Sequence, residues 1–286
     1  MDVGIGLPST IPGVQPGQVP EWARRAEAAG FSTLGTIDRI VYPNQDPLIA
    51  LAHAAAVTER IRLTTAILIL PYRQNAALVA KQAASLQHLS GGRLVLGAAI
   101  GARDDDYSAS GVPMEGRGER FEEMLGEMKR VWSGEEYGYA GAIGPDVREG
   151  PPPLIIGGQV DAAYRRAAEF GEGWMRGGGG PEGFAEGRAK LEEAWEKAGR
   201  DGKPRALSLA YFSLGGNARE QADWYIHDYY GFAGPYADML AQATATDADT
   251  VRAYVESFAE QGCDELILFP CSSDPHQVEL LAEAAL

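Results

Sequence analysis

Short apolar runs alternate with longer amphipathic stretches along almost the whole chain, and this alternation restricts the folds that the sequence can adopt. Eight runs are predicted to be strands, and each is followed by a helix or by a segment that contains one. Strands that are apolar throughout and are separated by helices indicate a parallel sheet covered by helices. Eight such units in 286 residues, about 36 residues each, favour a closed (β/α)8 TIM barrel over the alternative, an open doubly wound sheet.

The predicted elements follow from these patterns and from helix-ending residues such as Gly30. The strands are expected at Val3–Leu7, Ser32–Ile37, Ile61–Leu70, Leu94–Ala99, Leu154–Ile156, Gly173–Met175, Ala206–Leu214 and Glu265–Phe269. The helices are expected at Gln18–Ala29, Pro47–Thr58, Asn75–Leu89 with Asn75 as the cap, Arg117–Trp132, Ala162–Phe170, Pro181–Ala198, Asp247–Gln261 and Pro275–Ala285.

No linker divides the chain, so residues 1–286 are predicted to form a single domain, with insertions after strands 4, 5 and 7. Residues 133–153 are rich in Gly and Pro and predict a long loop. Residues 221–245 predict a helical insertion that contains His227, Tyr229 and Tyr230. Because this insertion follows the seventh strand, we expect it either to overhang the barrel mouth as a lid or to form a dimer contact.

Composition and missing motifs exclude several classes of function. The net charge is −15, with 25 Lys and Arg against 40 Asp and Glu, which argues against nucleic acid and anionic membranes as partners. No apolar run reaches the roughly 20 residues of a membrane span, no signal peptide is present, and Cys263 and Cys271 suit reduced thiols, so a cytoplasmic protein is expected. The four histidines are isolated and predict no metal site. There is no P-loop and no G-x-S-x-G, and Ser9 replaces the third glycine of a dinucleotide fingerprint.

In a TIM barrel the functional residues lie at the carboxyl ends of the strands. Glycine-rich segments follow the fourth, fifth and sixth predicted strands, and Gly157-Gly158-Gln159 directly precedes a helix. Backbone N–H groups in such a turn can bind phosphate, which points to a flat phosphorylated cofactor; the alternative is that the glycines only form tight turns. The acidic run Asp104–Asp106 is interpreted as a solvated loop.

Six segments, in order, resemble the bacterial luciferase-like superfamily, whose members use flavin mononucleotide (FMN) or the deazaflavin coenzyme F420. They begin with "GIGLP" at residues 4–8, "EWARRAEAAGFSTLGTID" at residues 21–38 and the long stretch of residues 47–101. Residues 104–125, residues 151–174 and the final "GCDELILFP" at residues 262–270 follow. The resemblance implies a barrel that holds an isoalloxazine-type ring over its strand ends.

The resemblance also implies roles for individual residues. A non-prolyl cis peptide is implied between Ala66 and Ile67, at the end of the third strand. Deazaflavin members of the family carry Asp-His after strand two; Asp38 matches the aspartate, whereas Arg39 replaces the histidine and cannot deliver a proton near neutral pH. Arg39 is expected either to pair with an anionic substrate or reduced ring or to form a surface salt bridge with a nearby acid. FMN luciferases place a phosphate-binding arginine where this chain has Ile100, and Arg103 is the residue that could compensate.

The resulting hypothesis is an oxidoreductase that transfers hydride between reduced F420 and a small organic substrate. The alternatives are an FMN-dependent monooxygenase that uses oxygen, a non-catalytic flavin-binding protein, and a cofactor-free barrel lyase or isomerase. A homodimer is expected. The residues expected to act in catalysis are Asp38, Arg39 and Tyr72, with Tyr72 either donating a proton or only packing. Those expected to bind the cofactor are Ser9, Asp38, Ala66, Ile67, Gly101, Arg103, Gly157, Gly158, Gln159 and Gly177.

Overall fold

The computed structural model describes residues 1–286 as a closed barrel of eight parallel strands. The strands follow one another around the barrel in sequence order, and the last pairs with the first through Gly4 opposite Ile267. This closure confirms the predicted TIM barrel and rules out the open sheet. The strands are β1 (Asp2–Gly6), β2 (Thr33–Thr36), β3 (Arg62–Ile69), β4 (Leu94–Ala99), β5 (Leu154–Gly157), β6 (Gly173–Arg176), β7 (Arg205–Phe212) and β8 (Glu265–Pro270).

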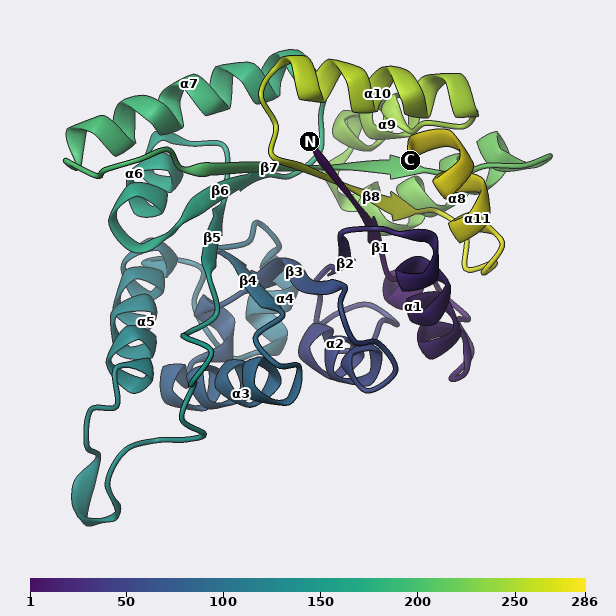
Figure 1. Cartoon of the computed structure of the whole chain (residues 1–286). Helices are drawn as coiled ribbons and strands as arrows, with labels where there is room; N and C mark the ends of the chain where they lie inside the picture. Colours follow the sequence, from purple (N-terminus) through teal and green to yellow (C-terminus); the bar gives the residue numbers. More distant parts are fainter.

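Helices surround the barrel (Figure 1). Their ends follow local sequence signals: the Asp46 carboxylate accepts hydrogen bonds from the first N–H groups of α2, Asn75 caps α3, and Gly30 ends α1 with φ of 97°. No helix of the protein is both long enough and apolar enough to span a membrane. The helices are α1 (Gln18–Ala29), α2 (Pro47–Ala55), α3 (Ala76–Leu89), α4 (Asp104–Ala109), α5 (Arg117–Trp132), α6 (Asp161–Phe170), α7 (Pro181–Lys197), α8 (Ala218–Tyr230), α9 (Pro235–Ala243), α10 (Ala248–Glu260) and α11 (Gln277–Ala285). Short 3-10 turns lie at η1 (Pro8–Thr10), η2 (Pro71–Arg73), η3 (Gly138–Ala140) and η4 (Gly231–Ala233).

The apolar core has two layers, one between the strands and the helices and one inside the barrel. Inside the barrel, the Phe269 ring fills the space over two glycines of the neighbouring strands. A Cβ atom on Gly6 would lie 2.3 Å from Phe269 Cδ1, and one on Gly35 would lie 2.9 Å from its Cζ. The missing side chains on β1 and β2 therefore leave room for one large aromatic side chain, as close packing requires.

Two of the three expected insertions are present. α4 follows β4, and the helical insertion α8–α9 follows β7. The insertion expected after the fifth strand is wrong, because α6 begins at Asp161, only three residues beyond β5. The Gly- and Pro-rich segment 133–153 instead precedes β5, where it leaves the end of α5 and projects from the barrel (Figure 1). Tyr139 at its outer turn is fully exposed.

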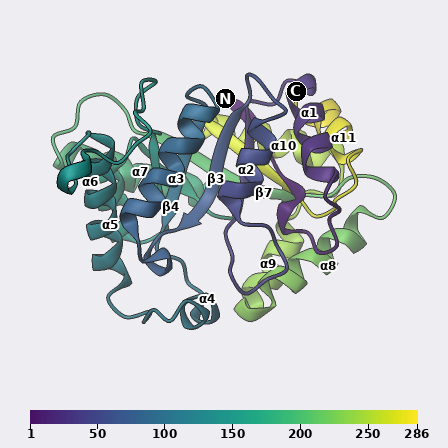
Figure 2. The ribbon, with the colours of Figure 1, turned by 90° about the horizontal axis from the view of Figure 1, so that it is seen from below.

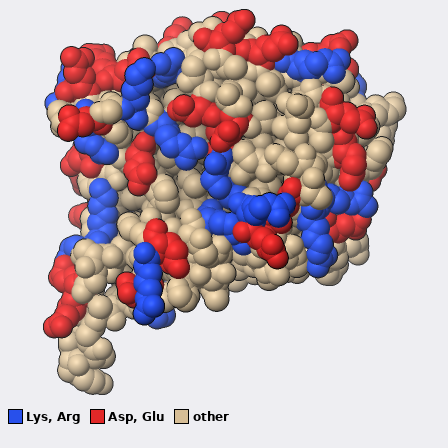
Figure 3. Space-filling model, viewed as in Figure 1, with Lys and Arg blue, Asp and Glu red and all other residues tan.

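The extra helices gather at one end of the barrel. In Figure 2 the N-terminus lies at one end of the molecule, and α4, α8 and α9 lie at the other. The latter is the end at which the strands finish, so these helices surround the barrel mouth. On the face seen in Figure 3, Lys and Arg side chains lie among Asp and Glu side chains and form no separate basic patch.

Candidate functional site

The end of β3 carries a bulge that turns Ile67 toward the barrel mouth. Thr65 pairs with Leu96 and Leu68 with Ala98, so two residues of β3 face the single residue Gly97 of β4. The peptide bond between Ala66 and Ile67 within this bulge is cis, as the resemblance implied.

A glycine on β5 and a glycine after the end of β4 make room for side chains in and beyond the bulge. A Cβ atom on Gly157 of β5 would lie 2.3 Å from Ile67 Cδ1, and one on Gly101 would lie 2.8 Å from Ile69 Cγ2. Gly101 also has φ of 68°, which favours glycine. The bulge and these glycines therefore form one packed unit across β3, β4 and β5.

A cavity of about 230 Å³ lies beside this unit, at the carboxyl ends of β3 to β7. Six of the residues expected to bind a cofactor line it, and the remaining walls are apolar side chains of the strands. Sequence reasoning missed those walls because a buried alanine, methionine or leucine on a strand has the same pattern as any core residue. The lining residues are Ala66, Ile67, Ala99, Gly157, Gly158, Gln159, Met175, Gly177 and Leu209.

The turn after β5 is fixed to the neighbouring strand by two hydrogen bonds. Gln159 Nε2 donates to the Gly177 carbonyl over 2.7 Å, and Trp174 Nε1 donates to the Gly158 carbonyl over 2.6 Å. Gly158 has φ of 137°. No side chain caps α6, which begins directly after this turn. Within its first turn, the Ala163 N–H donates to the Val160 carbonyl over 2.7 Å.

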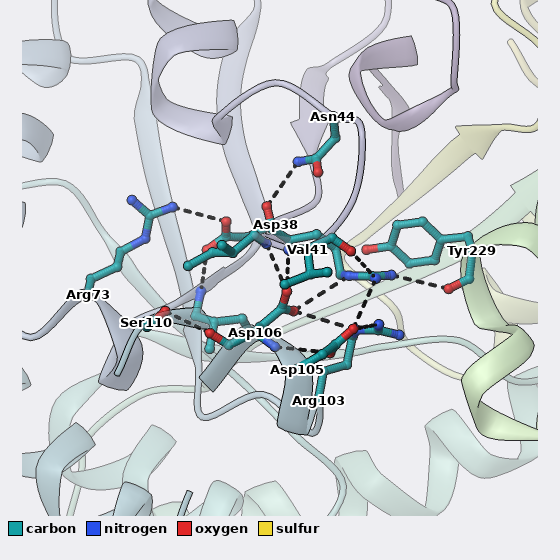
Figure 4. A network of polar contacts seen from close by, with 12 residues as sticks. Asp38, Val41, Asn44, Arg73, Arg103, Asp105, Asp106, Ser110 and Tyr229 are labelled. Atoms are coloured by element: carbon teal, nitrogen blue, oxygen red, sulfur yellow. Dashed lines mark hydrogen bonds and ion pairs between the residues drawn. The ribbon is translucent and has the colours of Figure 1, made fainter. Parts of the chain in front are cut away.

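Asp38 lies outside this cavity lining, in a polar network next to it (Figure 4). Its side chain is 1% exposed, and both oxygens are bonded: Oδ2 accepts from the Ile69 N–H over 2.9 Å, and Oδ1 accepts from Arg73 Nη2 over 3.0 Å. Burial raises the pKa of the Asp38 carboxyl, and the charge of Arg73 offsets part of that rise. The structure therefore brings Asp38 close to the site without exposing it there.

Arg39 is held in the same network by acidic and aromatic groups. Its Nε lies 3.5 Å from Asp106 Oδ2, its Nη1 donates to the Tyr229 carbonyl over 3.2 Å, and its guanidinium lies against the rings of Tyr42 and Tyr229. Arg39 therefore forms a salt bridge with a nearby acid, but the pair is buried and not at the surface as we expected.

The acidic run after β4 is not the solvated loop that we expected. Asp104–Asp106 begins α4, and Asp106 is buried. Asp106 Oδ1 accepts hydrogen bonds from the backbone N–H groups of Ile40 over 3.0 Å and Val41 over 2.7 Å. The expectation was wrong because these partners lie in a distant part of the chain, and no local pattern marks them.

Arg103 is paired within the same run. Its guanidinium bonds Asp105, lies 3.6 Å from Asp106 Oδ2, and covers the Phe232 ring at 4.0 Å. Burial would raise the pKa of Asp105, but the bond from Arg103 lowers it below its usual range. The charge of Arg103 is therefore already balanced by carboxylates, and its side chain does not line the cavity.

Three other expected residues also lie outside the cavity lining. The Tyr72 hydroxyl is buried without a hydrogen-bond partner, and burial, followed by the charge of Asp38, raises its pKa. Its ring packs edge-on against Tyr107 at 5.7 Å. The Ser9 hydroxyl in η1 is likewise buried and unpartnered. The three atoms nearest to a Cβ built on Gly101 all belong to Ile69.

The insertion after β7 is helical, as predicted, and joins the barrel through pairs of hydroxyl groups. Tyr230 of α8 lies 2.7 Å from the hydroxyl of Tyr211 on β7, and Tyr225 lies 2.7 Å from the hydroxyl of Thr10 in η1. The Tyr211 ring in turn packs against Phe269 inside the barrel at 6.2 Å. This aromatic group lies on the β7–β8–β1 side of the barrel mouth. The cavity lies at the ends of β3 to β7, where Leu209 is its only β7 residue.

The chemistry that these walls offer is limited to packing and to amide hydrogen bonds. No carboxylate, imidazole, thiol or ammonium group lines the cavity. No group of three or more His, Cys, Asp or Glu residues is placed to bind a metal ion, and both cysteines are free and buried. The cavity suits a flat apolar ring, and the reactive atoms would belong to what binds there.

Comparison with known proteins gives consistent results for sequence and fold. A family profile described as luciferase-like monooxygenase matches residues 1–264. An uncharacterised protein of Mycobacterium tuberculosis is 32% identical over 245 residues, which are 75% of this chain and 84% of that protein. An FMNH2-dependent dimethylsulfone monooxygenase of Pseudomonas putida is 26% identical over 207 residues, 68% of this chain and 56% of that protein. The structure of an F420-dependent secondary alcohol dehydrogenase in complex with an F420-acetone adduct has a TM-score of 0.81 at 19% identity, covering 99% of this chain and 97% of that one.

Proposed function

Because the chain belongs to the luciferase-like monooxygenase family, we propose that it is an oxidoreductase that transfers hydride between the deazaflavin F420 and a small organic substrate. The family includes F420-dependent and FMN-dependent enzymes. The observation that carries the proposal is the cavity between the β3 bulge and the glycine turns after β5 and β6.

The residues around the cavity fit a flat ring. Ala66, Ile67 and Met175 offer apolar faces, and the lack of side chains on Gly157 and Gly158 allows a ligand to approach the backbone. When bound, a reduced deazaflavin supplies a hydride to an unsaturated carbon, an imine or a carbonyl. The chain itself would orient the ring, exclude water from one of its faces and bind the phosphate through N–H groups at the start of α6.

The choice of F420 over FMN rests on the charges after β4. Ile100 stands where FMN luciferases carry a phosphate-binding arginine, and Arg103, which could compensate, is already paired with Asp105 and Asp106. A phosphate there would have to compete with two carboxylates. A cofactor whose binding does not depend on that arginine is therefore favoured.

FMN remains a second candidate because a sequence relative is named as FMNH2-dependent. With FMN the reaction would be a monooxygenation, since the reactive position of reduced flavin reacts with oxygen and the corresponding carbon of a deazaflavin does so poorly. The arrangement of the cavity walls would be the same for both rings.

Titration of the protein with each cofactor separates these candidates. We expect F420 to bind, with a change in its visible absorbance and fluorescence, and FMN to bind at least about tenfold more weakly, a difference of roughly 1.4 kcal/mol. Preferential binding of FMN would contradict the F420-dependent activity and favour an FMN-dependent monooxygenase instead. Tight binding of either ring without turnover of any alcohol, ketone, imine or enone would indicate a flavin-binding protein instead.

We also propose that the protein is a homodimer. α2 and α3 present three apolar side chains that are at least half exposed, Ile49, Leu78 and Leu89, around a groove of about 490 Å³. Exposed apolar residues gathered on neighbouring helices favour association with another surface. Light scattering should give the mass of two chains, and Leu89→Glu should shift it toward one chain, whereas a wild-type mass of one chain would contradict the proposal.

A further inference from the structure

Asp38 lies where the barrel loses one of its strand pairings. β2 ends at Thr36, which pairs with Thr65, so no β2 residue faces β3 beyond the start of the bulge. The backbone N–H of Ile69, on the far side of the bulge, therefore has no strand partner on that side. A buried N–H group without an acceptor is strongly unfavourable, so this position requires a substitute.

The Asp38 carboxylate provides that substitute. Oδ2 accepts from the Ile69 N–H over 2.9 Å, in the place that a strand carbonyl would otherwise occupy. Oδ1 accepts from Arg73 of η2 over 3.0 Å, so the strand end and the turn that follows it are both fixed to one side chain. Arg73 also bonds Asp46 Oδ2 over 3.1 Å, and Asp46 caps α2.

This anchoring bears directly on the cavity wall. Ile69 packs against Gly101, and Ile67, two residues earlier, fills the space over Gly157 and lines the cavity. If the strand end moved, both isoleucines would leave the glycines that accommodate them. The setting of Ala66 and Ile67 in the wall thus depends on how residues 69–73 are held.

We propose that Asp38 is a positioning residue that holds the bulged end of β3 so that Ala66 and Ile67 form the wall against the cofactor ring. The role of the ring rests on the proposed function; the role of Asp38 in holding β3 does not. With one hydrogen bond on each oxygen and the side chain 1% exposed, the Asp38 carboxylate is buried in the polar network and does not line the cavity.

Two substitutions of Asp38 and one of Arg73 test this role. Asp38→Asn keeps an oxygen that can accept from the Ile69 N–H and removes the charge that pairs with Arg73, whereas Asp38→Ala removes both. Arg73→Met removes the ion pair but keeps the hydrogen bond from the Ile69 N–H to the Asp38 carboxylate. The control is Glu265→Gln, since Glu265 is also buried and paired with two arginines, Arg62 and Arg205, but lies at the opposite end of the barrel.

Amide hydrogen exchange gives a readout that needs no cofactor. In Asp38→Ala, the amides of residues 66–70, 72 and 73 should exchange at least about tenfold faster, in line with the loss of a hydrogen bond to a charged group, while residues 62–65 stay as in the wild type. Asp38→Asn and Arg73→Met should show smaller increases in the same residues. Unchanged exchange at Ile69 in Asp38→Ala would overturn the proposal. If Asp38→Ala does not fold, the smaller increases in the other two variants decide the question.

Cofactor binding gives the second readout. The dissociation constant for F420, or for FMN if that is the ring bound, should rise about tenfold in Asp38→Ala and less in Asp38→Asn, with a shifted absorbance of the bound ring. Glu265→Gln should bind as the wild type does. An Asp38→Asn variant with wild-type exchange and affinity but no turnover would assign a proton-transfer role and overturn the proposal. A wild type that binds neither ring would overturn the proposed function, and the exchange measurement would still test Asp38.

Discussion

Single residues decide the shape of the cavity more than they decide its chemistry. Because Gly157 has no side chain, the Ile67 side chain can occupy the space above it. Gly101 leaves space for the Ile69 side chain in the same way. The glycines after the strands and the residues Ala66 and Ile67 were predictable from the sequence together with the resemblance. The burial of Asp38 and the pairing of Arg39 with Asp106 were not, because these contacts join segments far apart in the chain and no spacing marks them.

Adding a methyl group at Gly157 should displace Ile67 into the cavity. The new Cβ would lie 2.3 Å from Ile67 Cδ1, so we expect Gly157→Ala to lower the free energy of unfolding by about 1–3 kcal/mol and to weaken cofactor binding. The measurements are urea unfolding and a cofactor titration. Combining it with Ile67→Ala should recover part of the lost stability, because the clash is then absent.

A matched control is available in α5. A Cβ atom on Gly126 would meet nothing within 4 Å, so Gly126→Ala should stabilise the protein by about 0.5–1 kcal/mol through helix propensity alone. Equal losses of stability at Gly126 and Gly157, or a Gly157→Ala variant as stable as the wild type, would contradict the packing argument.

Among the elements, the strands and long helices were predictable because apolar runs and amphipathic periods mark them within a few residues of their observed ends. α4 was missed because its acidic first turn resembles a solvated loop, and only the N–H groups of Ile40 and Val41 show why Asp106 is buried. The insertion expected after the fifth strand was wrong, because α6 begins soon after β5, whereas the loop predicted at residues 133–153 does lie between α5 and β5. The helical insertion at residues 221–245 was foreseen, but neither its division into α8 and α9 nor the hydroxyl pairs that join α8 to the barrel were.

The contact between α8 and α9 should depend on pH through His227. Its Nε2 lies 2.9 Å from Asp238 Oδ1 on α9, and its Nδ1 lies 2.7 Å from the Asp223 carbonyl. The bond to Asp238, followed by that to Asp223, raises the pKa of His227 above 6.5. The stability gained from the charged form is therefore fully present below about pH 6.5, the value in the unfolded chain, and is lost as the pH rises through the higher value of the folded protein.

An NMR titration of the His227 ring checks this pH dependence. The midpoint should lie above 6.5 in the wild type and fall toward 6.5 in Asp238→Asn. Protection of the α9 amides, corrected for intrinsic exchange, should decline across the same interval and should lose this pH dependence in His227→Gln. A His227 midpoint at or below 6.5 in the wild type would contradict the assigned contact.

At the scale of the whole molecule, the two ends of the barrel have different tasks. The end where the strands begin is closed by charges: buried Glu265 of β8 pairs with Arg62 of β3 over 3.0 Å and with Arg205 of β7 over 3.1 Å. The end where the strands finish carries the cavity, the polar network and the helical insertion. This division agrees with the general placement of function and stability in such barrels. The closed fold was predictable from eight repeating units. The position of the cavity within the barrel mouth was not, because it depends on which aromatic side chains occupy the rest of the mouth.

Glu265→Gln should therefore affect stability alone. We expect a loss of about 1–3 kcal/mol in the free energy of unfolding, because two arginines lose a buried charged partner, with no change in cofactor affinity. Asp2→Asn, which removes an exposed partner of Arg62, should change stability by less than about 0.5 kcal/mol. Urea unfolding followed by both fluorescence and circular dichroism gives both values, and a Glu265→Gln variant that loses cofactor binding but not stability would contradict the division.

The most direct test of the central claim is a crystal structure of the protein with its preferred ring cofactor, F420 or FMN, bound. We expect the ring to lie against Ala66 and Ile67, with its edge toward Gly157, Gly158 and Gln159 and with Asp38 still bonded to the Ile69 N–H. A ring bound elsewhere, or a complex in which Asp38 leaves Ile69 to contact the cofactor, would contradict it.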